Sequence, residues 1–381
     1  MKSGNNTTVP GAGRPWDLAL GLLNAAQHTQ SPPVLAGFDG FVDTILHVVS
    51  ERRSPTDYTR LLTLKEFGQK VLAASGGRNM NIEMVARLTK IGGNGPILSY
   101  ALAHFGIQVT YIGSLGSPKL HSVFADFAKR VRTYSIGEPG FSDAIEFTDG
   151  KLVLGRQQSL SELSWQSILS ALSLDELSEF VKQAGLIAFV NWGIVFSMTD
   201  IMNDFLNHIG DHLREPRKPL FIDTTDPTKR SEEDILGLID ILPRLARKFE
   251  VYLSFNLRES TFFARAIGLT EPDANSPLDV LAYSKELRER LRIDGVVIHW
   301  SRYAAGADST SGASVEAQYT DNPKITTGAG DHFNAGFCLG RLLGGDMDTN
   351  IRLGIATSGY YVRQAHSPTV AELIEFVKTL S

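Results

Sequence analysis

The run from 325 to 333, Ile-Thr-Thr-Gly-Ala-Gly-Asp-His-Phe, holds the residues best suited to chemistry. Its Gly-Ala-Gly stretch leads into Asp331 and an apolar-periodic segment, which predicts a tight loop that opens a helix. Glycine lets the backbone approach a ligand closely, and a helix N-terminus offers N–H groups and partial positive charge, which suit a phosphoryl group. An aspartate in the first helical turn can take a proton from an attacking hydroxyl. The run therefore predicts an anion site beside a general base.

A purely structural interpretation of this run is a helix start, in which glycines form the turn and the carboxylate favours the helix dipole. Two better-known glycine motifs are excluded. A dinucleotide fingerprint requires glycine where Phe333 stands, and a P-loop requires Gly-Lys-Ser/Thr, which occurs nowhere in the chain. The choice between a structural and a catalytic aspartate therefore depends on the elements around it.

The composition of the 381 residues, 43% hydrophobic and 21% charged, is that of an ordinary globular protein of one large α/β domain or two smaller ones. The net charge of −5 gives no basic footprint for nucleic acid. The only cysteine, Cys338, excludes an internal disulfide and fits a reducing compartment. No apolar stretch is long enough to span a bilayer, and the polar, glycine-rich residues 1–14 predict a disordered leader rather than a signal peptide. We therefore expect a cytoplasmic protein.

Strands and helices are predicted to alternate along most of the chain. After a helix at 16–26, strands are expected at 34–37, 109–113, 186–191, 220–223, 250–255 and 295–300, and helices near 199–214, 232–248 and 279–291. Alternation with short connections favours a parallel, doubly wound sheet, and such sheets bind ligands beyond the carboxyl ends of their strands. Those ends hold Asp43, Asn191, Asp223, Asn256 and the 325–331 loop. Residues 81–90 alternate apolar and polar, which predicts a strand with one covered face.

Three motifs together resemble the ribokinase-like (PfkB) family of sugar kinases, from residue 34 to the C-terminus. Residues 327–333, Thr-Gly-Ala-Gly-Asp-x-Phe, are similar to the family's C-terminal signature. Gly-Gly-Asn-Gly at 92–95, leading into 101–106, resembles its N-terminal glycine signature, and Asn-Leu-Arg-Glu at 256–259 matches its Asn-x-x-Glu. The three stand in the expected order, each after the expected kind of element.

The resemblance implies an α/β fold with a doubly wound, mostly parallel sheet flanked by helices and a small β lid over a sugar site. One such domain would span 15–381, with lid segments near 44–91 and 140–156 and lid strands at 81–90 and 143–147. The resemblance also implies transfer of the γ-phosphoryl group of ATP to a hydroxyl of a sugar or sugar derivative, with Mg²⁺. Dimers through the lid are common in the family, so it favours a homodimer.

Residue roles follow from the same resemblance. Asp331 is the expected base, beside an anion hole from Gly328, Ala329 and Gly330. Nucleotide and phosphates are expected at Thr326, Thr327, Asn256 and Glu259, with Glu259 holding magnesium through water. Sugar contacts are expected from Asp43, Gly92, Gly93, Asn94 and Asn191. Asp39 competes with Asp43, because this loop is one residue longer than the usual pattern.

Four departures from the family pattern affect the nucleotide and cation sites more than the base. Ile325 replaces an aspartate that helps bind a monovalent cation, which argues against cation activation. Ile97 and Ile355 stand where the family often has asparagine, near sugar and adenosine respectively. His-Trp-Ser-Arg-Tyr-Ala at 299–304 replaces the segment that lies along the nucleotide, and Arg302 is a candidate for supplying positive charge to the phosphates there.

Several alternatives stay open at the level of sequence. Asp43 can be a loop carboxylate in an Asx-type turn, and the pair Asn256 and Glu259 can be a polar helix start. His208 and His212, at i and i+4 of a predicted helix, are near the pattern of inverted zinc hydrolases, though no third ligand suggests itself. Beside a sugar kinase, the chain could be a kinase for a nucleoside or other small alcohol, or a non-catalytic ligand-binding or regulatory protein on the same scaffold.

Overall fold

A nine-stranded, mostly parallel sheet forms the centre of the computed structural model, which describes residues 15–75, 77, 79–213, 216–273 and 275–380. The predicted leader at 1–14 lies outside the described residues. The strand order is β14-β13-β12-β11-β10-β9-β1-β5-β6. The strands are β1 (Val34–Phe38), β5 (Val109–Gly113), β6 (Arg132–Ser135), β9 (Leu186–Val190), β10 (Lys218–Asp223), β11 (Phe249–Asn256), β12 (Gly295–His299), β13 (Tyr303–Asp308) and β14 (Gly312–Glu316). The six strands predicted from apolar runs are confirmed, as is their parallel pairing.

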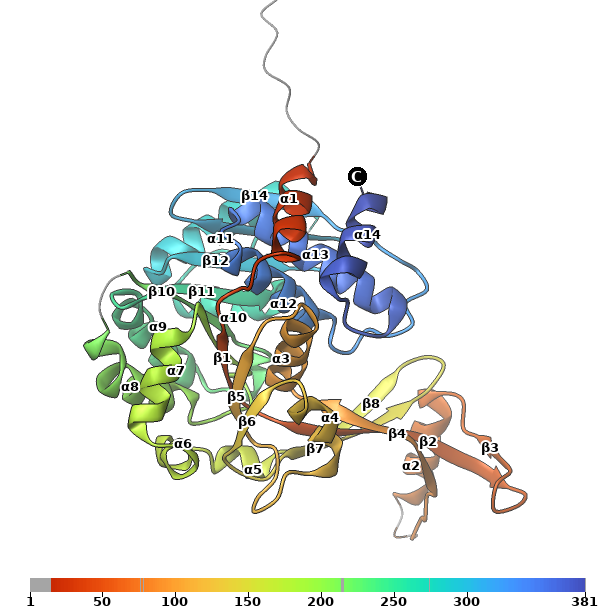
Figure 1. Ribbon diagram of the computed structural model, residues 1–381. Helices are drawn as coiled ribbons and strands as arrows, with labels where there is room; N and C mark the ends of the chain where they lie inside the picture. The colour runs from red at the N-terminus through yellow and green to blue at the C-terminus, as the bar shows by residue number, and fades with distance from the viewer. Residues whose placement is uncertain (1–14, 76, 78, 214–215, 274, 381) are drawn as a thin grey trace, which may run out of the picture.

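Helices cover both faces of this sheet (Figure 1), because its central strands are buried on both sides and need an apolar layer above and below. One face packs against α6 (Trp165–Ala171), α7 (Leu174–Gln183), α8 (Met198–His208), α9 (Glu232–Ala246), α10 (Leu257–Ala266) and α11 (Pro277–Leu291). The other packs against α1 (Asp17–Ala26), α3 (Asn94–His104), α4 (Ala125–Ala128), α12 (Ala329–Leu342), α13 (Met347–Gln364) and α14 (Val370–Leu380). No helix in the described ranges is long and apolar enough to cross a membrane.

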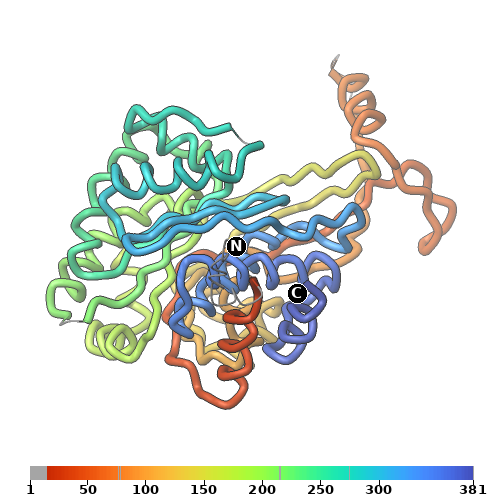
Figure 2. Tube along the Cα trace, turned by 90° about the horizontal axis from the view of Figure 1, so that it is seen from above, coloured from red at the N-terminus to blue at the C-terminus, as the bar shows by residue number. Residues whose placement is uncertain are grey.

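A second sheet of five strands projects from this body, as Figures 1 and 2 both show. It contains β2 (Phe41–Arg52), β3 (Tyr58–Arg60), β4 (Met84–Gly92), β7 (Gly140–Glu146) and β8 (Lys151–Arg156). Helix α2 (Leu64–Ala74) packs on one face of it, over a small core that includes Val48 and Ile145. The opposite face turns toward the loop before α12, since Lys151 on that face donates a hydrogen bond to the Thr327 hydroxyl at 3.0 Å.

Three expectations about elements are wrong. Asp43 lies on β2, paired with Lys90, rather than in a loop at the end of a buried strand. Strand β4 has no covered face along most of its length, since residues 86–89 are exposed on both sides. Helix α8 ends at His208, and His212 belongs to a separate 3₁₀ turn, so the two histidines do not share one helix. Within the described residues no group of three or more metal-ligating side chains forms.

The packing of α12 on α13 gives a test of the fold. A Cβ added at Gly336 would collide with the carbonyl oxygen of Leu353 and the hydroxyl of Thr357. We expect Gly336→Ala to destabilise the protein by about 1–3 kcal/mol, as overpacking does. The matched control is Gly237→Ala on the exposed side of α9, where nothing lies within 4 Å of the new methyl group.

Because alanine is the better helix former, the control should stabilise the protein by about 0.5–1 kcal/mol. Urea unfolding of the three proteins measures both changes. Equal stabilities of the two variants would contradict the close approach of α12 to α13.

Candidate active site

Asp39, directly after β1, is fully buried and joins three elements of the site. Its carboxylate accepts hydrogen bonds from the backbone N–H groups of Asn94 (2.9 Å) and Gly95 (2.8 Å), at the start of α3. The side-chain amide of Asn191, at the end of β9, donates to the same carboxylate at 2.6 Å. Burial raises the pKa of Asp39 to about 6, although these donors oppose the shift. Asp39 therefore serves as an anchor between the sheet and α3.

Gly93 makes the approach between α3 and Asp39 feasible. Its φ of 92° lies in the region that only glycine adopts readily, and a Cβ there would come within 2.7 Å of the Asp39 carboxylate. Neighbouring Gly92 passes directly over the carboxylate of Asp43 on β2, where a Cβ would also collide. The glycine signature thus brings two aspartates and the N-terminus of α3 together.

Asp223, the last residue of β10, is the central carboxylate of the site. It accepts a hydrogen bond from the Asn334 side chain on α12 at 3.1 Å and lies 3.4 Å from the Asn94 amide. Burial raises its pKa to about 6, and the charge of Asp39 adds to that effect. Sequence reasoning noted Asp223 only as a strand end and gave it no role.

Asp331 lies in the first turn of α12, as predicted, and is buried beside these carboxylates. Burial raises its pKa well above the ordinary range, and the charges of Asp223, Asp39 and Asp43 raise it further. The Asn94 amide hydrogen-bonds to it and opposes this shift. A carboxylate surrounded by like charges has a high affinity for a proton, which is the property required of a base that must deprotonate an alcohol.

The loop before α12 is held by three side chains that sequence reasoning missed. Gly328 has a φ of 94°, and its carbonyl oxygen lies 2.7 Å from Nδ1 of buried His332. Because a carbonyl only accepts, Nδ1 carries the proton, and Nε2 accepts from the hydroxyl of Ser367 at 2.8 Å. The Tyr361 hydroxyl donates to the carbonyl of Thr327 at 2.9 Å and its ring stacks on His332.

These contacts turn the loop into a defined helix start. The N–H of Ala329 donates to the Thr326 carbonyl in this structure, at 3.1 Å. The N–H groups of Gly330 and Asp331 belong to the first helical turn and have no acceptor within the helix. An anion at this end would meet those N–H groups and the positive end of the α12 dipole.

Asn256 and Glu259 form a reciprocal capping box at the start of α10. The Asn256 side chain accepts from the Glu259 N–H at 2.9 Å, and the Glu259 carboxylate accepts from the Asn256 N–H at 2.8 Å. This is the polar helix start considered as the structural alternative. Burial and the charge of Asp223 raise the pKa of Glu259 to about 8. The pair therefore also borders the carboxylate cluster.

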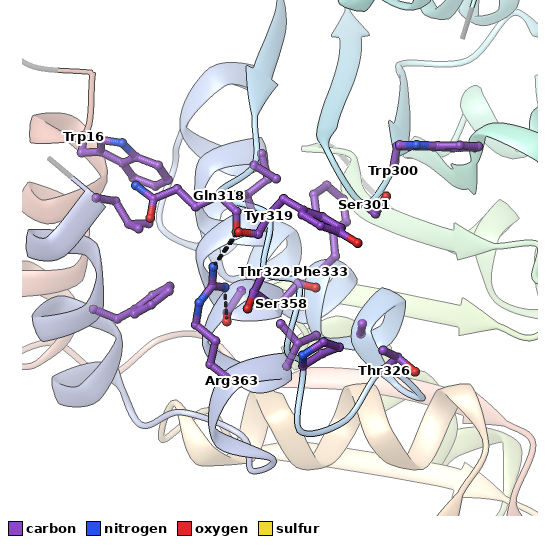
Figure 3. Close-up of a pocket in the computed structure, with 18 residues that line it drawn as sticks. Trp16, Trp300, Ser301, Gln318, Tyr319, Thr320, Thr326, Phe333, Ser358 and Arg363 are labelled. Carbon is purple, nitrogen blue, oxygen red and sulfur yellow. Dashed lines mark hydrogen bonds between the residues drawn. The ribbon is translucent and has the colours of Figure 1, made fainter. Parts of the chain in front are cut away.

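On the other side of the loop lies a cavity of about 360 Å³ with mostly apolar walls (Figure 3). Thr326, Ala329 and Phe333, at the loop and the start of α12, line it together with Ile355 of α13. Trp300 and Ser301, from the segment that departs from the family pattern, line it together with the stretch Gln318–Thr320, which the Arg363 guanidinium fixes through the carbonyl of Gln318. Trp16, just before α1, also lines it.

Arg302 does not line this cavity. Its guanidinium lies over the ring of Tyr319, 5.0 Å from the ring centre, and the side chain is exposed. Most of the other predicted site residues surround the 326–331 loop or the Asp223 carboxylate, from the ends of β1, β9, β10 and β11 and from the starts of α3 and α12. Asp43 reaches the same region from the second sheet.

Comparisons with known proteins agree with this architecture. The profile of the prokaryotic ketohexokinase family matches residues 24–380. A ketohexokinase from Haloferax volcanii is 30% identical over 344 residues, which cover 90% of both chains. Among solved structures, Arabidopsis thaliana ribokinase complexed with ribose and ATP has a TM-score of 0.61 at 16% identity, covering 92% of this chain and 99% of that one. A ribokinase from Cryptococcus neoformans var. grubii serotype A in complex with ADP gives 0.63 at 14%, covering 91% and 99%. These two likenesses show the fold.

Fold and site together define a ribokinase-like carbohydrate kinase, a phosphotransferase whose acceptor is an alcohol group. Within that class, the chain belongs to the prokaryotic ketohexokinase family.

The raised pKa of Asp223 predicts how stability depends on pH. The folded protein binds this proton more tightly than the unfolded chain, so the free energy of unfolding should fall as pH rises from about 4 to 6. A shift from 3.8 to about 6 corresponds to about 3 kcal/mol. We expect Asp223→Asn to reduce this decline in urea unfolding of the ligand-free protein at pH 4 to 7, while Asp39, whose pKa burial also raises to about 6, keeps part of it.

The control for this measurement is Asp126→Asn, at an exposed residue whose pKa is lowered by Lys129. Removal of the Asp126 carboxylate should leave the fall in the free energy of unfolding with rising pH unchanged. The same slope in wild type and Asp223→Asn would show that Asp223 is ionised without penalty in the folded protein.

Proposed function

We propose that this carbohydrate kinase transfers the γ-phosphoryl group of ATP to a hydroxyl group of a ketohexose. The observation that carries the proposal is the position of Asp331, between the glycine loop that opens α12 and the buried carboxylates at the strand ends. The ketohexose is suggested by the names of the family and of the Haloferax volcanii relative. A nucleoside or another small alcohol is the alternative acceptor.

Sugar hydroxyls would be held between the second sheet and the start of α3. Asp43 and Asn94 offer polar groups there, and the side-chain oxygen of buried Asn191 has no hydrogen-bond partner among the described residues. An unpaired buried oxygen is costly unless a ligand satisfies it, so a sugar hydroxyl is a fitting donor. Asp39 is engaged with α3 and Asn191 and acts as a support, not as a sugar ligand, in this proposal.

In the reaction, Asp331 would accept the proton of the attacking hydroxyl as the hydroxyl oxygen bonds to the γ-phosphorus. The bond from that phosphorus to the bridging oxygen breaks, and ADP leaves. The negative charges of Asp223, Asp39 and Asp43 strengthen Asp331 as a base. The first-turn N–H groups of α12 would hold the oxygens of the transferred group, and the helix dipole would favour their charge. His332 and Tyr361 keep the loop in shape through its carbonyl groups.

The nucleotide would enter from the opposite side of the loop. Its base fits the apolar cavity between Trp300 and Arg363, and its phosphates would extend past Thr326 and Thr327 toward Gly330. Arg302 stays a candidate phosphate contact. The second sheet would act as the lid, over a single domain from 15 to 381.

Magnesium fits this site through water rather than by direct protein ligation. Burial raises the pKa values of Asp223 and Glu259, and the charges of neighbouring carboxylates raise them further, so a nearby cation would relieve part of that repulsion. No set of three ligating side chains exists in the described chain, and Mg²⁺ in any case prefers to keep several waters and to bind phosphates. When bound, the ion would screen the phosphate charge. We propose no monovalent cation, since Ile325 offers no carboxylate.

Asp331→Asn tests the base directly. We expect turnover to fall by about 10²–10⁴-fold, the usual contribution of general base catalysis, because an amide cannot accept the proton. Coupled ADP release with Mg-ATP across a panel of ketohexoses, other sugars and nucleosides gives the rates and names the acceptor. Sugar binding by calorimetry should persist, and stability should not fall, since a buried charge is removed.

Wild-type turnover in Asp331→Asn would remove this residue from the role of base. If the enzyme phosphorylates nucleosides but no ketohexose, the acceptor is a nucleoside and the ketohexose is excluded.

We further propose a cytoplasmic homodimer formed through the second sheet. Leu88 on β4 and Val153 on β8 are 52% and 54% exposed. By strand alternation they lie on the face opposite α2, where a second copy could cover them. The buried, free thiol of Cys338 and the use of ATP favour the cytoplasm.

Leu88→Asp should convert the dimer to a monomer, because a carboxylate would be buried against the partner's apolar face. Light scattering after gel filtration measures the mass of each protein. Leu236→Asp, at an exposed leucine of α9, is the matched control and should leave the dimer intact. A monomeric wild type would exclude this dimer.

A further inference from the structure

The candidate site has an excess of negative charge before any substrate binds. Asp223, Asp39 and Asp43 all raise the pKa of Asp331, and Glu259 borders the same cluster. ATP phosphates add more negative charge, which the α12 dipole offsets only in part. Kinases neutralise the transferred group with positively charged side chains as well as metal ions. Such a side chain should therefore lie within reach of the 326–331 loop.

The second sheet supplies one at Lys151. The Nζ atom of this residue, the first of β8, lies 3.0 Å from the hydroxyl oxygen of Thr327. Thr327 immediately precedes Gly328, in the loop whose carbonyl groups are held by Tyr361 and His332. The ammonium group therefore lies beside the N-terminus of α12, where the phosphoryl group is expected. Among the described residues Lys151 forms no ion pair within 4 Å.

Lys90 supplies a second positive charge from the neighbouring part of the sheet. It stands opposite Asp43 in the pairing of β2 with β4, and its side chain is half-buried. Burial lowers its pKa, while the charges of Asp43, Asp331 and Glu146 oppose the shift and that of Lys151 adds to it. Both lysines in turn lower the pKa of Asp43 against its burial. Lys90 thus lies between the sugar side and the base.

The register of the second sheet places these groups on one face. Asp43 pairs with Lys90 and with Ser142, and Lys151 pairs with Glu146 at the end of the β7–β8 hairpin. Residues two apart on a strand share a face, so Asp43, Ser142, Glu146 and their partners all point away from α2 and toward the site. The register of the sheet therefore fixes the face on which both lysines lie.

We propose that Lys151 contacts the phosphoryl group during transfer and that Lys90, which stands opposite Asp43, is a positioning residue that orients the Asp43 carboxylate toward the sugar. This inference rests on the proposed kinase reaction. Lys151 would stabilise the charge on the transferred oxygens without taking or giving a proton. Because both lysines belong to the second sheet, positive charge would reach the loop only when that sheet is in place over the site, so phosphoryl transfer would be tied to sugar binding.

Lys151→Met tests the inference with fructose as the acceptor. We expect kcat to fall by about 100- to 1,000-fold, the usual loss when a group that stabilises transition-state charge is removed, with little change in the KM for fructose. Lys151→Arg should restore part of the rate. If Lys151 only linked β8 to the loop, Lys151→Met would instead raise the KM for fructose and the KM for ATP. Lys151→Arg would then not restore the rate.

A second readout does not depend on turnover. ADP with aluminium fluoride mimics the transferred phosphoryl group, and with Mg²⁺ and fructose it should raise the Tm of the wild type beyond ADP alone. Lys151→Met should lose that additional shift and keep the shift due to ADP. The matched control is Lys70→Met on α2, an exposed lysine of the same sheet region, which should behave as wild type.

Lys90→Met should show the opposite kinetic split, a raised KM for fructose with a smaller effect on kcat. If the wild type is active and Lys151→Met matches it in both readouts, the inference about Lys151 is wrong and the proposed function stands. A wild type that forms no ADP with any ketohexose would overturn the proposed function, and this inference with it.

Discussion

The hydrogen bonds that Asp39 accepts are the interaction on which the rest of the site depends. One carboxylate binds the first N–H groups of α3 and the amide of Asn191, while the backbone of Asp39 accepts from the hydroxyl of buried Tyr111. Those contacts join β1, β5, β9 and α3 at one point. Because β2 begins two residues later, the same anchor sets where the second sheet leaves the body. Only glycine fits at position 93 in this arrangement, because a Cβ there would collide with the Asp39 carboxylate.

This anchor gathers negative charge that the folded chain would otherwise avoid. Asp39, Asp223 and Asp331 are buried within one network of asparagine amides, and each has a raised pKa. Like charges in a low-dielectric environment oppose folding at neutral pH, so these carboxylates lower the free energy of unfolding. The central sheet and its two helical layers, buried on both faces, supply the stability that tolerates it. Such a trade of stability for reactivity is typical of catalytic centres.

The sequence predicted the elements with strong apolar patterns and failed where composition or tertiary contacts decide. Uniformly apolar runs such as 186–190 and 251–255 read directly as buried parallel strands. The β13–β14 hairpin was missed, because 303–308, Tyr-Ala-Ala-Gly-Ala-Asp, has little β-branched character. The motifs predicted that Asp331 with its glycine loop, and the glycines at 92–95, open helices, and the structure has them there. Asp223, Lys90 and Lys151 belong to no motif, and only the register of two sheets brings them near Asp331.

One face of the second sheet carries both charged and exposed apolar side chains. That face carries Lys90 and Lys151, and the same strands carry exposed Leu88 and Val153, both at the level of Ile45 on β2. Alternation forces this sharing, because Leu88 and Lys90 lie two residues apart on β4, as Lys151 and Val153 do on β8. A surface that covers the apolar part would therefore also restrict the orientation of the lysines. In a dimer formed there, each subunit would help to set the electrostatics of its partner's site without contributing a residue to it.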